Sequence, residues 1–224
     1  MSDIHALIFD FDGLLLDTEL PEYTAWQAIY ADYGAELPLS EWARCVGSSF
    51  DEFDPYDYLE EQIGTTIDRP RIRSRQREHH RALIGQEDLL PGVRDWLSAA
   101  GESGIICAVA SSSKHEWVDP HLVSRGIASH FTCVICREDA ERVKPAPDLF
   151  LAAAQCADVD PTHCLVLEDS VNGIFAAKAA GMCAVAVPNQ ITAGLNFSSA
   201  DLVLQSLADL TLSEVFDRMD REAR

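Results

Sequence analysis

Near the start of the chain stands Leu7-Ile8-Phe9-Asp10-Phe11-Asp12-Gly13-Leu14-Leu15-Leu16-Asp17-Thr18-Glu19, where an apolar run ends at two carboxylates. The run, Ile4 to Phe9, predicts a strand of a parallel sheet, because such strands are buried on both faces. Ligands of open α/β sheets bind beyond the carboxyl ends of the strands. Asp10, Asp12 and Gly13, which permits close approach of the backbone, therefore predict a site for a cation, a phosphate or both.

The pattern Asp-x-Asp-Gly also occurs in turns and in calcium-binding loops. A calcium loop of the helix–loop–helix kind needs further oxygen ligands at fixed spacing and a Glu at its end. Here Leu14, Leu15 and Leu16 occupy the following positions, which excludes that kind of loop. A strand followed by a plain turn remains open from this stretch alone.

The composition limits the number of domains and the classes of partner that the chain can have. Its 224 residues are enough for one large or two small domains, and 47% of them are hydrophobic. We expect no secretory signal, and no stretch approaches the roughly 18–20 apolar residues of a membrane span. The net charge of −20 argues against nucleic acid or an anionic membrane as a partner. We expect a monomer, and a phosphorylated substrate would need local cations, for which Lys114, Lys144 and Lys178 are the only lysines.

The seven cysteines are scattered along the chain. Four of them fall in or beside predicted strands and are expected to be small buried hydrophobes: Cys107, Cys133, Cys164 and Cys183. Cys133 and Cys136 have CxxC spacing, but on a strand their thiols would point to opposite faces, so metal or redox use is the weaker interpretation. A reducing, cytoplasmic location fits this usage best.

Apolar periodicity and turn residues divide the chain into two parts. Helices are predicted over 19–33, 40–45, 52–63 and 68–84, with a loop at 46–50 and no strand between 18 and 84. Strands are then predicted over 105–110, 131–135, 164–167, 183–187 and 201–204, alternating with helices over 93–100, 115–125, 147–157, 171–180 and 207–219. Gly101 is expected to stop the helix at 93–100.

Alternation of strands and helices indicates βαβ crossovers and a parallel sheet. The predicted architecture is therefore an α/β core, residues 1–16 and 88–224, interrupted after its first strand by a helical cap, residues 17–87. The cap would join the core through two short connections and gate access to the site.

Polar groups follow four strands and would meet at one edge of a parallel sheet. They are Asp10 with Asp12, Ser111 with Ser112 and Lys114, Lys144, and Glu168 with Asp169. The carboxylates of Asp10 and Asp169 are hard oxygen ligands suited to Mg²⁺. The hydroxyl of Ser111 and the ammonium of Lys144 would hold phosphate oxygens. We expect Gly13, Ser112, Lys114 and the amides of the following helix to complete a phosphate cradle.

Two carboxylates two residues apart suit phosphoryl transfer. A carboxylate attacking a phosphate dianion meets like-charge repulsion, which a bridging Mg²⁺ would remove. Asp10 would then form an aspartyl-phosphate. Asp12 would protonate the leaving alkoxide and later deprotonate the attacking water.

These residues resemble the haloacid dehalogenase-like hydrolase superfamily. The motifs that carry the resemblance are Phe9-Asp10-Phe11-Asp12-Gly13 with Asp17-Thr18-Glu19, Ala110-Ser111-Ser112-Ser113-Lys114, Lys144-Pro145-Ala146-Pro147-Asp148-Leu149-Phe150, and Leu167-Glu168-Asp169-Ser170-Val171-Asn172-Gly173. The resemblance spans the whole core and implies a three-layer Rossmann-like core with a small helical cap. It implies the roles given above for Asp10, Asp12, Ser111 and Lys144. It also implies Mg²⁺ bound by Asp10, Asp169, Glu168 and the backbone carbonyl of Asp12.

Within the superfamily the chain looks like the phosphatase and β-phosphoglucomutase branch. The mutases carry a His shortly after the Asp-Thr pair and an Arg in a cap loop, whereas Glu22 and Phe50 stand near those places here. The dehalogenases lack the second aspartate. The resemblance therefore favours a Mg²⁺-dependent hydrolase of a small phosphorylated metabolite, such as a sugar phosphate. A sugar phosphomutase and a non-catalytic binding module are the alternatives.

The cap holds six arginines between residues 69 and 81: Arg69, Arg71, Arg73, Arg75, Arg77 and Arg81, with His79 and His80 beside them. The simpler interpretation is a solvated surface paired with the many acids of the chain. The functional one is that one or two of these arginines bind a second anionic group of the substrate. Tyr23 and Trp26 are expected in the cap core, Phe50 on its cleft side, and His5 buried within the first strand.

Overall fold

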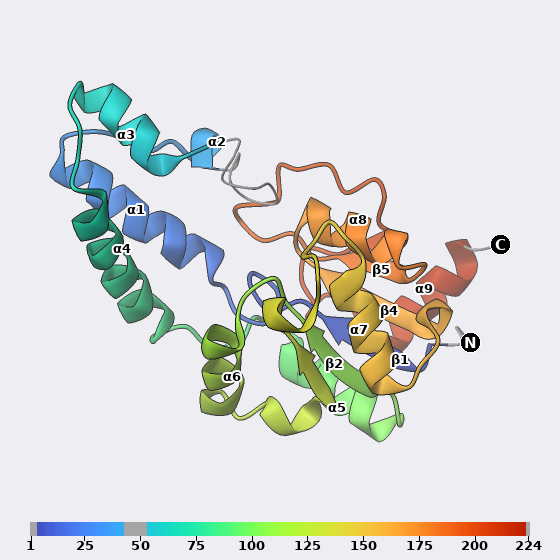
Figure 1. Cartoon of the computed structure of the whole chain (residues 1–224). Helices are drawn as coiled ribbons and strands as arrows, with labels where there is room; N and C mark the ends of the chain where they lie inside the picture. Colours follow the sequence, from blue (N-terminus) through green and yellow to red (C-terminus); the bar gives the residue numbers. More distant parts are fainter. Residues whose placement is uncertain (1–3, 43–52, 223–224) are drawn as a thin grey trace.

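A six-stranded parallel sheet forms the centre of the molecule (Figure 1). The computed structural model describes residues 4–42 and 53–222, and the strand order is β3-β2-β1-β4-β5-β6. The strands are β1 (Ala6–Phe9), β2 (Ile106–Ala110), β3 (Cys133–Ile135), β4 (Cys164–Glu168), β5 (Cys183–Ala186) and β6 (Leu202–Val203). Every pair is parallel, which confirms the predicted sheet.

Strand β1 lies at the point where the strand order reverses. The strands that follow it fill one side of the sheet up to β3, and the chain then crosses to β4 on the other side. Phe9, the last residue of β1, is in register with Val109 of β2 and Leu167 of β4. The carboxyl ends of the three strands therefore meet at one edge, at the kind of crevice where such sheets bind ligands.

Helices cover both faces of the sheet and make three layers. They are α5 (Val93–Glu102), α6 (His115–Ser124), α7 (Asp148–Ala157), α8 (Val171–Ala179) and α9 (Leu212–Glu222). Leu7 and Phe9 of β1 share one hydrophobic cluster with α5, α6 and α9, whereas Ala6 and Ile8 share another with α7 and α8. Because alternate residues of a strand face opposite sides, an uninterrupted apolar run is what a strand covered on both faces needs.

In the part of the cap that the structure describes, four helices lie beyond this edge of the sheet (Figure 1). They are α1 (Glu19–Asp32), α2 (Leu39–Trp42), α3 (Pro55–Ile63) and α4 (Arg69–Ile84). Its own core includes Tyr23 and Trp26, as predicted. Phe50 and the loop expected at 46–50 lie outside the described residues. The domain boundaries at 17 and 88 stay a prediction; an antiparallel bridge between Leu16 and Leu89 joins the two connections there.

Several sequence expectations are wrong. Gly101 lies inside α5, and the chain turns instead at Gly104, whose φ is 69°. The last helix begins at Leu212 rather than 207, because Thr211 and Glu214 form reciprocal side-chain-to-backbone hydrogen bonds that set its first turn. His5 is exposed, and its ring stacks on that of His163.

Cys133 is not a free buried thiol but forms a disulfide with Cys156 of α7, while Cys136 keeps a free, buried thiol. Disulfides are rare where thiols are kept reduced, so this pairing does not favour the expected reducing compartment. The location stays a prediction. In the described part of the chain, no helix has both the length and the apolar character needed to span a membrane.

Candidate active site

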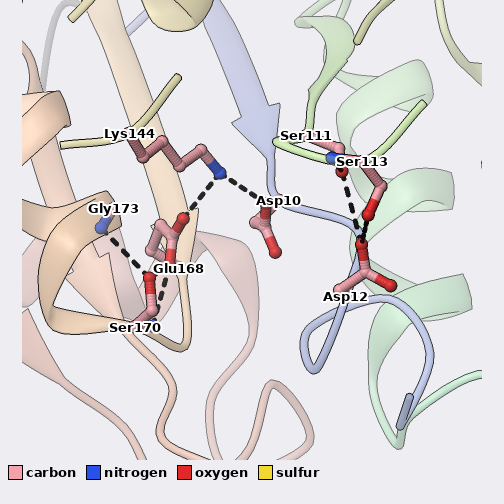
Figure 2. A network of polar contacts seen from close by, with 8 residues as sticks. All are labelled: Asp10, Asp12, Ser111, Ser113, Lys144, Glu168, Ser170 and Gly173. Carbon is pink, nitrogen blue, oxygen red and sulfur yellow. Dashed lines mark hydrogen bonds and ion pairs between the residues drawn. The ribbon is translucent and has the colours of Figure 1, made fainter. Parts of the chain in front are cut away.

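Asp10 is the first residue beyond β1, and its carboxylate is buried among charged groups (Figure 2). Its backbone N–H donates to the carbonyl of Leu167 at 3.0 Å, which continues the β1–β4 pairing by one residue. The Lys144 ammonium contacts Asp10 Oδ1 and also donates to Glu168 Oε1 at 2.6 Å. One buried lysine thus bridges a carboxylate from each of the two strands that flank the crevice.

The surroundings of Lys144 and Glu168 hold this bridge in place. The Lys144 side chain is 6% exposed, and its ammonium lies 4.8 Å from the centre of the Phe150 ring. Glu168, the last residue of β4, accepts hydrogen bonds at 2.8 Å from both the backbone N–H and the hydroxyl of Ser170. Burial alone lowers the pKa of Lys144, but the charges of Asp10 and Glu168 outweigh burial and raise it. Lys144 is therefore a cation held by the two carboxylates.

Three buried carboxylates lie close enough together to share a metal ion. One oxygen from each of Asp10, Glu168 and Asp169 lies within 4.8 Å of the other two. Burial raises the pKa of Asp10 to about 8 against the opposing charge of Lys144, and burial with the charge of Glu168 raises the pKa of Asp169 well above its usual range. When all three are ionised, the carboxylates outnumber the single lysine and leave a local excess of negative charge. An all-oxygen set with that excess fits Mg²⁺.

Gly13 and Asn189 position Asp169. The Asn189 side-chain amide donates to Asp169 Oδ2 at 2.7 Å. Gly13 has a φ of 77°, and a Cβ added there would stand 2.3 Å from the same oxygen. The expected close approach at Gly13 is therefore between the backbone and the carboxylate of Asp169. Asn189 was not predicted for the site, and no motif around it indicates such a role.

Gly13→Ala should cost about 1–3 kcal/mol in the free energy of unfolding for its backbone conformation alone. The clash with Asp169 should add to this and weaken Mg²⁺ binding, measured by calorimetry. Gly34→Ala is the matched control, because Gly34 has a φ of 68° and open space around it. Equal losses of stability and unchanged Mg²⁺ affinity in the two variants would show that Gly13 has no role beyond its backbone.

Asp12 points to the other side of the crevice, away from Lys144 and toward Ser111 and Ser113 (Figure 2). Its Oδ2 accepts a hydrogen bond from the hydroxyl of Ser113 at 2.6 Å and a long one from Ser111 at 3.4 Å. The indole N–H of Trp117 donates to Asp12 Oδ1 at 2.9 Å. Ser111 also accepts the backbone N–H of Ser113 at 3.0 Å. The carboxylate of Asp12 therefore stands apart from the three that could share a metal.

A cavity of about 1030 Å³ lies above both aspartates. Of the residues predicted for the site, it is lined by Asp10, Asp12, Ser111, Ser112, Lys144, Glu168 and Asp169. Lys114, by contrast, is exposed at the start of α6 and is not among the lining residues described, so the structure does not bring it to the cradle. Ser113 and Trp117, which were not predicted for the site, line it instead.

Residues of α1 and α4 in the cap also line the cavity. Glu19 and Glu22 line it, and burial together with the charge of Asp12 raises the pKa of Glu22 to about 7. His80 Nε2 donates a hydrogen bond to the carbonyl of Thr18 at 3.2 Å, and its ring stacks on that of Trp117 with the ring centres 5.4 Å apart. The cap thus touches the same indole that holds Asp12.

Comparison with known proteins agrees with this geometry. A family model of haloacid dehalogenase-like hydrolases matches residues 7–187. The chain belongs to this family. YhcW of Bacillus subtilis (strain 168), named for an assumed phosphatase activity, is 42% identical over 219 residues, covering 98% of this chain and 99% of that protein. Hexitol phosphatase B of Escherichia coli (strain K12) is 31% identical over 215 residues, covering 95% and 96%.

Solved structures support the same assignment. CbbY from Rhodobacter sphaeroides, in complex with phosphate, has a TM-score of 0.74 and 28% identity, covering 94% of this chain and 98% of that one. A haloacid dehalogenase family hydrolase from Deinococcus radiodurans, with bound phosphate and sodium, has a TM-score of 0.80 and 26% identity, covering 98% of each. The chain is therefore an enzyme, a haloacid dehalogenase-like phosphatase, and lies in the branch that includes the β-phosphoglucomutases.

Proposed function

We propose that the chain is a Mg²⁺-dependent phosphohydrolase that cleaves a small phosphomonoester, such as a sugar phosphate, through an aspartyl-phosphate on Asp10. One observation carries the proposal: the buried Asp10 carboxylate lies between Lys144 and the metal-fitting carboxylates, in a cavity that Asp12 also lines. The names of relatives support the substrate class, since they include hexitol and pseudouridine-5′ phosphatases.

The reaction would proceed in two displacements at phosphorus. A carboxylate oxygen of Asp10 attacks, the ester P–O bond breaks, and the leaving alkoxide takes a proton from Asp12. A water molecule then gives a proton back to Asp12 and attacks the same phosphorus. The bond between Asp10 and phosphorus breaks, which releases inorganic phosphate and restores the carboxylate of Asp10 and the protonated carboxyl of Asp12.

The side chains that surround Asp10 would hold the phosphoryl group. Lys144 already contacts Asp10, so its ammonium would also reach an oxygen of the group being transferred. Ser111 and Ser112 line the same cavity on the α6 side and would donate to its other oxygens. Asp10, Glu168 and Asp169 would hold Mg²⁺, which when bound offsets the charge of the phosphate.

We expect Mg²⁺ to be required for turnover. Chelation should lower the rate of phosphate release from a panel of sugar phosphates by about 100-fold or more, since such an ion supplies several kcal/mol of transition-state stabilisation. Added Mg²⁺ should restore the rate, and Ca²⁺, which prefers more ligands at longer distances, should restore less of it. Release that persists in chelator would contradict the metal assignment.

The phosphomutase alternative remains, because β-phosphoglucomutase of Bacillus subtilis (strain 168) is 31% identical over 223 residues. Product analysis of the same reactions distinguishes a hydrolase from a phosphomutase. A hydrolase releases inorganic phosphate in proportion to the substrate consumed, whereas a mutase converts one sugar phosphate to its isomer and releases little.

A further inference from the structure

Four arginines form a row along α4. Arg69, Arg73, Arg77 and Arg81 recur every fourth residue, so their side chains lie on one side of the helix. A cavity of about 810 Å³ runs along this row, lined by all four together with residues that include Tyr56 and Ser74. Like charges at this spacing destabilise a helix, so the row does not serve the helix itself.

The row is paired with acidic residues at its outer end alone, as far as the described residues show. There Arg69 contacts Asp57 and Glu60. Arg75, off the row, pairs with Asp32. In the described part of the chain, Arg73, Arg77 and Arg81 form no ion pair, although the sequence has 37 acidic residues and only 17 basic ones. The simpler interpretation, a solvated surface whose arginines pair with the acids of the chain, therefore does not account for these three arginines.

The row leads into the catalytic cavity. Arg77 and Arg81 line both cavities, and from Arg81 to Arg73 the helix rises about 12 Å. On the core side, by contrast, Lys144 is already engaged by Asp10 and Glu168. Arg137 of the core also lines the catalytic cavity, but the positive charges that the two cavities share come from α4.

The buried amide of Gln76 lies next to the row. Gln76 lines the catalytic cavity and is 6% exposed, and its Nε2 has no hydrogen-bond partner among residues 4–42 and 53–222. Leaving a buried donor unpaired costs free energy. The Nε2 group of Gln76 is therefore suited to donate a hydrogen bond to an oxygen of a bound ligand. Glu19 and Glu22 face the same space from α1 and, when ionised, can only accept hydrogen bonds, as from hydroxyl groups.

We propose that the substrate carries a second anionic group, a phosphate or a carboxylate, at the end opposite the phosphate that is cleaved, and that Arg77 and Arg81 bind it. Gln76 donates to an oxygen between the two ends, and Glu19 and Glu22 accept from hydroxyls there. The substrate class is a hydroxylated chain with an anion at each end, such as a sugar bisphosphate or a phosphorylated sugar acid. This inference rests on the proposed phosphohydrolase activity.

Matched substrates test the inference by turnover. We would compare kcat/KM for fructose 1,6-bisphosphate with fructose 6-phosphate, and for 6-phosphogluconate with glucose 6-phosphate. The natural chain should favour the compound with two anionic groups in at least one pair, by about tenfold or more, which one charge-assisted hydrogen bond is enough to produce. Arg77→Gln/Arg81→Gln should abolish that preference, mainly through KM. Arg75→Gln, whose partner is Asp32, is the matched control and should keep it.

Binding to Asp10→Asn, measured by calorimetry with Mg²⁺ and the same compounds, tests the inference without turnover. The preference for two anionic groups should persist in this variant and disappear when the two arginine substitutions are added. Equal affinities for both members of every pair would overturn the inference. It would also be overturned if the two arginine substitutions lowered the affinity equally for both members, because the arginines would then bind the transferred phosphate. Selective binding without phosphate release from any compound would leave this inference standing and contradict the proposed hydrolysis.

Discussion

Asp10→Asn is expected to lower phosphate release by about 10,000-fold while leaving the fold intact. The amide has the shape of the carboxylate but is a poor nucleophile, so the aspartyl-phosphate cannot form. Asp12 cannot take over as the nucleophile, since it is held toward α6 by Ser113 and Trp117. Release of inorganic phosphate under saturating substrate and Mg²⁺ is the measurement.

The unfolding temperature of Asp10→Asn shows whether its loss of activity results from misfolding. Because burial disfavours the charged form and raises the pKa of Asp10 to about 8, the folded protein holds the Asp10 proton more tightly than the unfolded chain does. The ionised carboxylate therefore destabilises the metal-free fold increasingly as the pH rises from about 4 to about 8. In chelator at pH 8, Asp10→Asn should unfold at a temperature no lower than that of the natural chain. A variant that is fully folded and still turns over would rule out Asp10 as the nucleophile.

The strand ends could be predicted from sequence because they depend on local patterns. A buried apolar run that stops at a charged residue marks both the strand and its end, and parallel strands must bring those ends to one edge. These local patterns are enough to predict that Asp10, Glu168 and Lys144 lie together. The register of β1 between β2 and β4 confirms that sheet edge.

The contacts that depend on side-chain direction could not be predicted in the same way. Ser111, Ser112, Ser113 and Lys114 are consecutive, and only the turn into α6 decides that Ser113 meets Asp12 while Lys114 is exposed. Asn189 reaches Asp169 from a loop 20 residues further along the chain. No sequence period links such positions, because they meet only through the tertiary fold.

Disulfide pairing was missed for the same reason. Cys133 and Cys156 are 23 residues apart, one on β3 and one on α7, and their approach follows from how that helix crosses the sheet. The start of α9 is a different case, since the Thr-x-x-Glu pattern at Thr211 and Glu214 was present in the sequence and predicts a helix start.

Asp12→Asn is expected to lower kcat/KM for sugar phosphates by roughly 100- to 10,000-fold, the usual contribution of a general acid or base. The loss should depend on the leaving group. An alkoxide needs a proton as the ester bond breaks, whereas p-nitrophenolate does not, so formation of the phospho-enzyme from p-nitrophenyl phosphate should suffer much less. Rapid-quench measurement of the first turnover separates that step from hydrolysis, in which Asp12 acts as the base for both substrates.

Glu22 is the rival for this role, because it lines the same cavity and burial raises its pKa to about 7. If Glu22 were the acid, Glu22→Gln would show the dependence on the leaving group and Asp12→Asn would not. Substitution of Glu22 should instead act equally on the first turnover of both substrates or change KM alone.

Trp117 is the positioning residue for Asp12, and Trp117→Phe tests its hydrogen bond. An aromatic ring that can stack on His80 is kept, while the N–H that donates to Asp12 Oδ1 is lost together with the five-membered ring that carries it. A hydrogen bond to a charged group contributes about 1.5–3 kcal/mol, so we expect a loss of roughly tenfold or more in kcat for alkyl phosphates. That loss should carry the same dependence on the leaving group as Asp12→Asn and should nearly vanish in the Asp12→Asn background, since the two residues would then act as one unit. An equal loss in both backgrounds would mean that the indole acts through its stack on the cap rather than through Asp12.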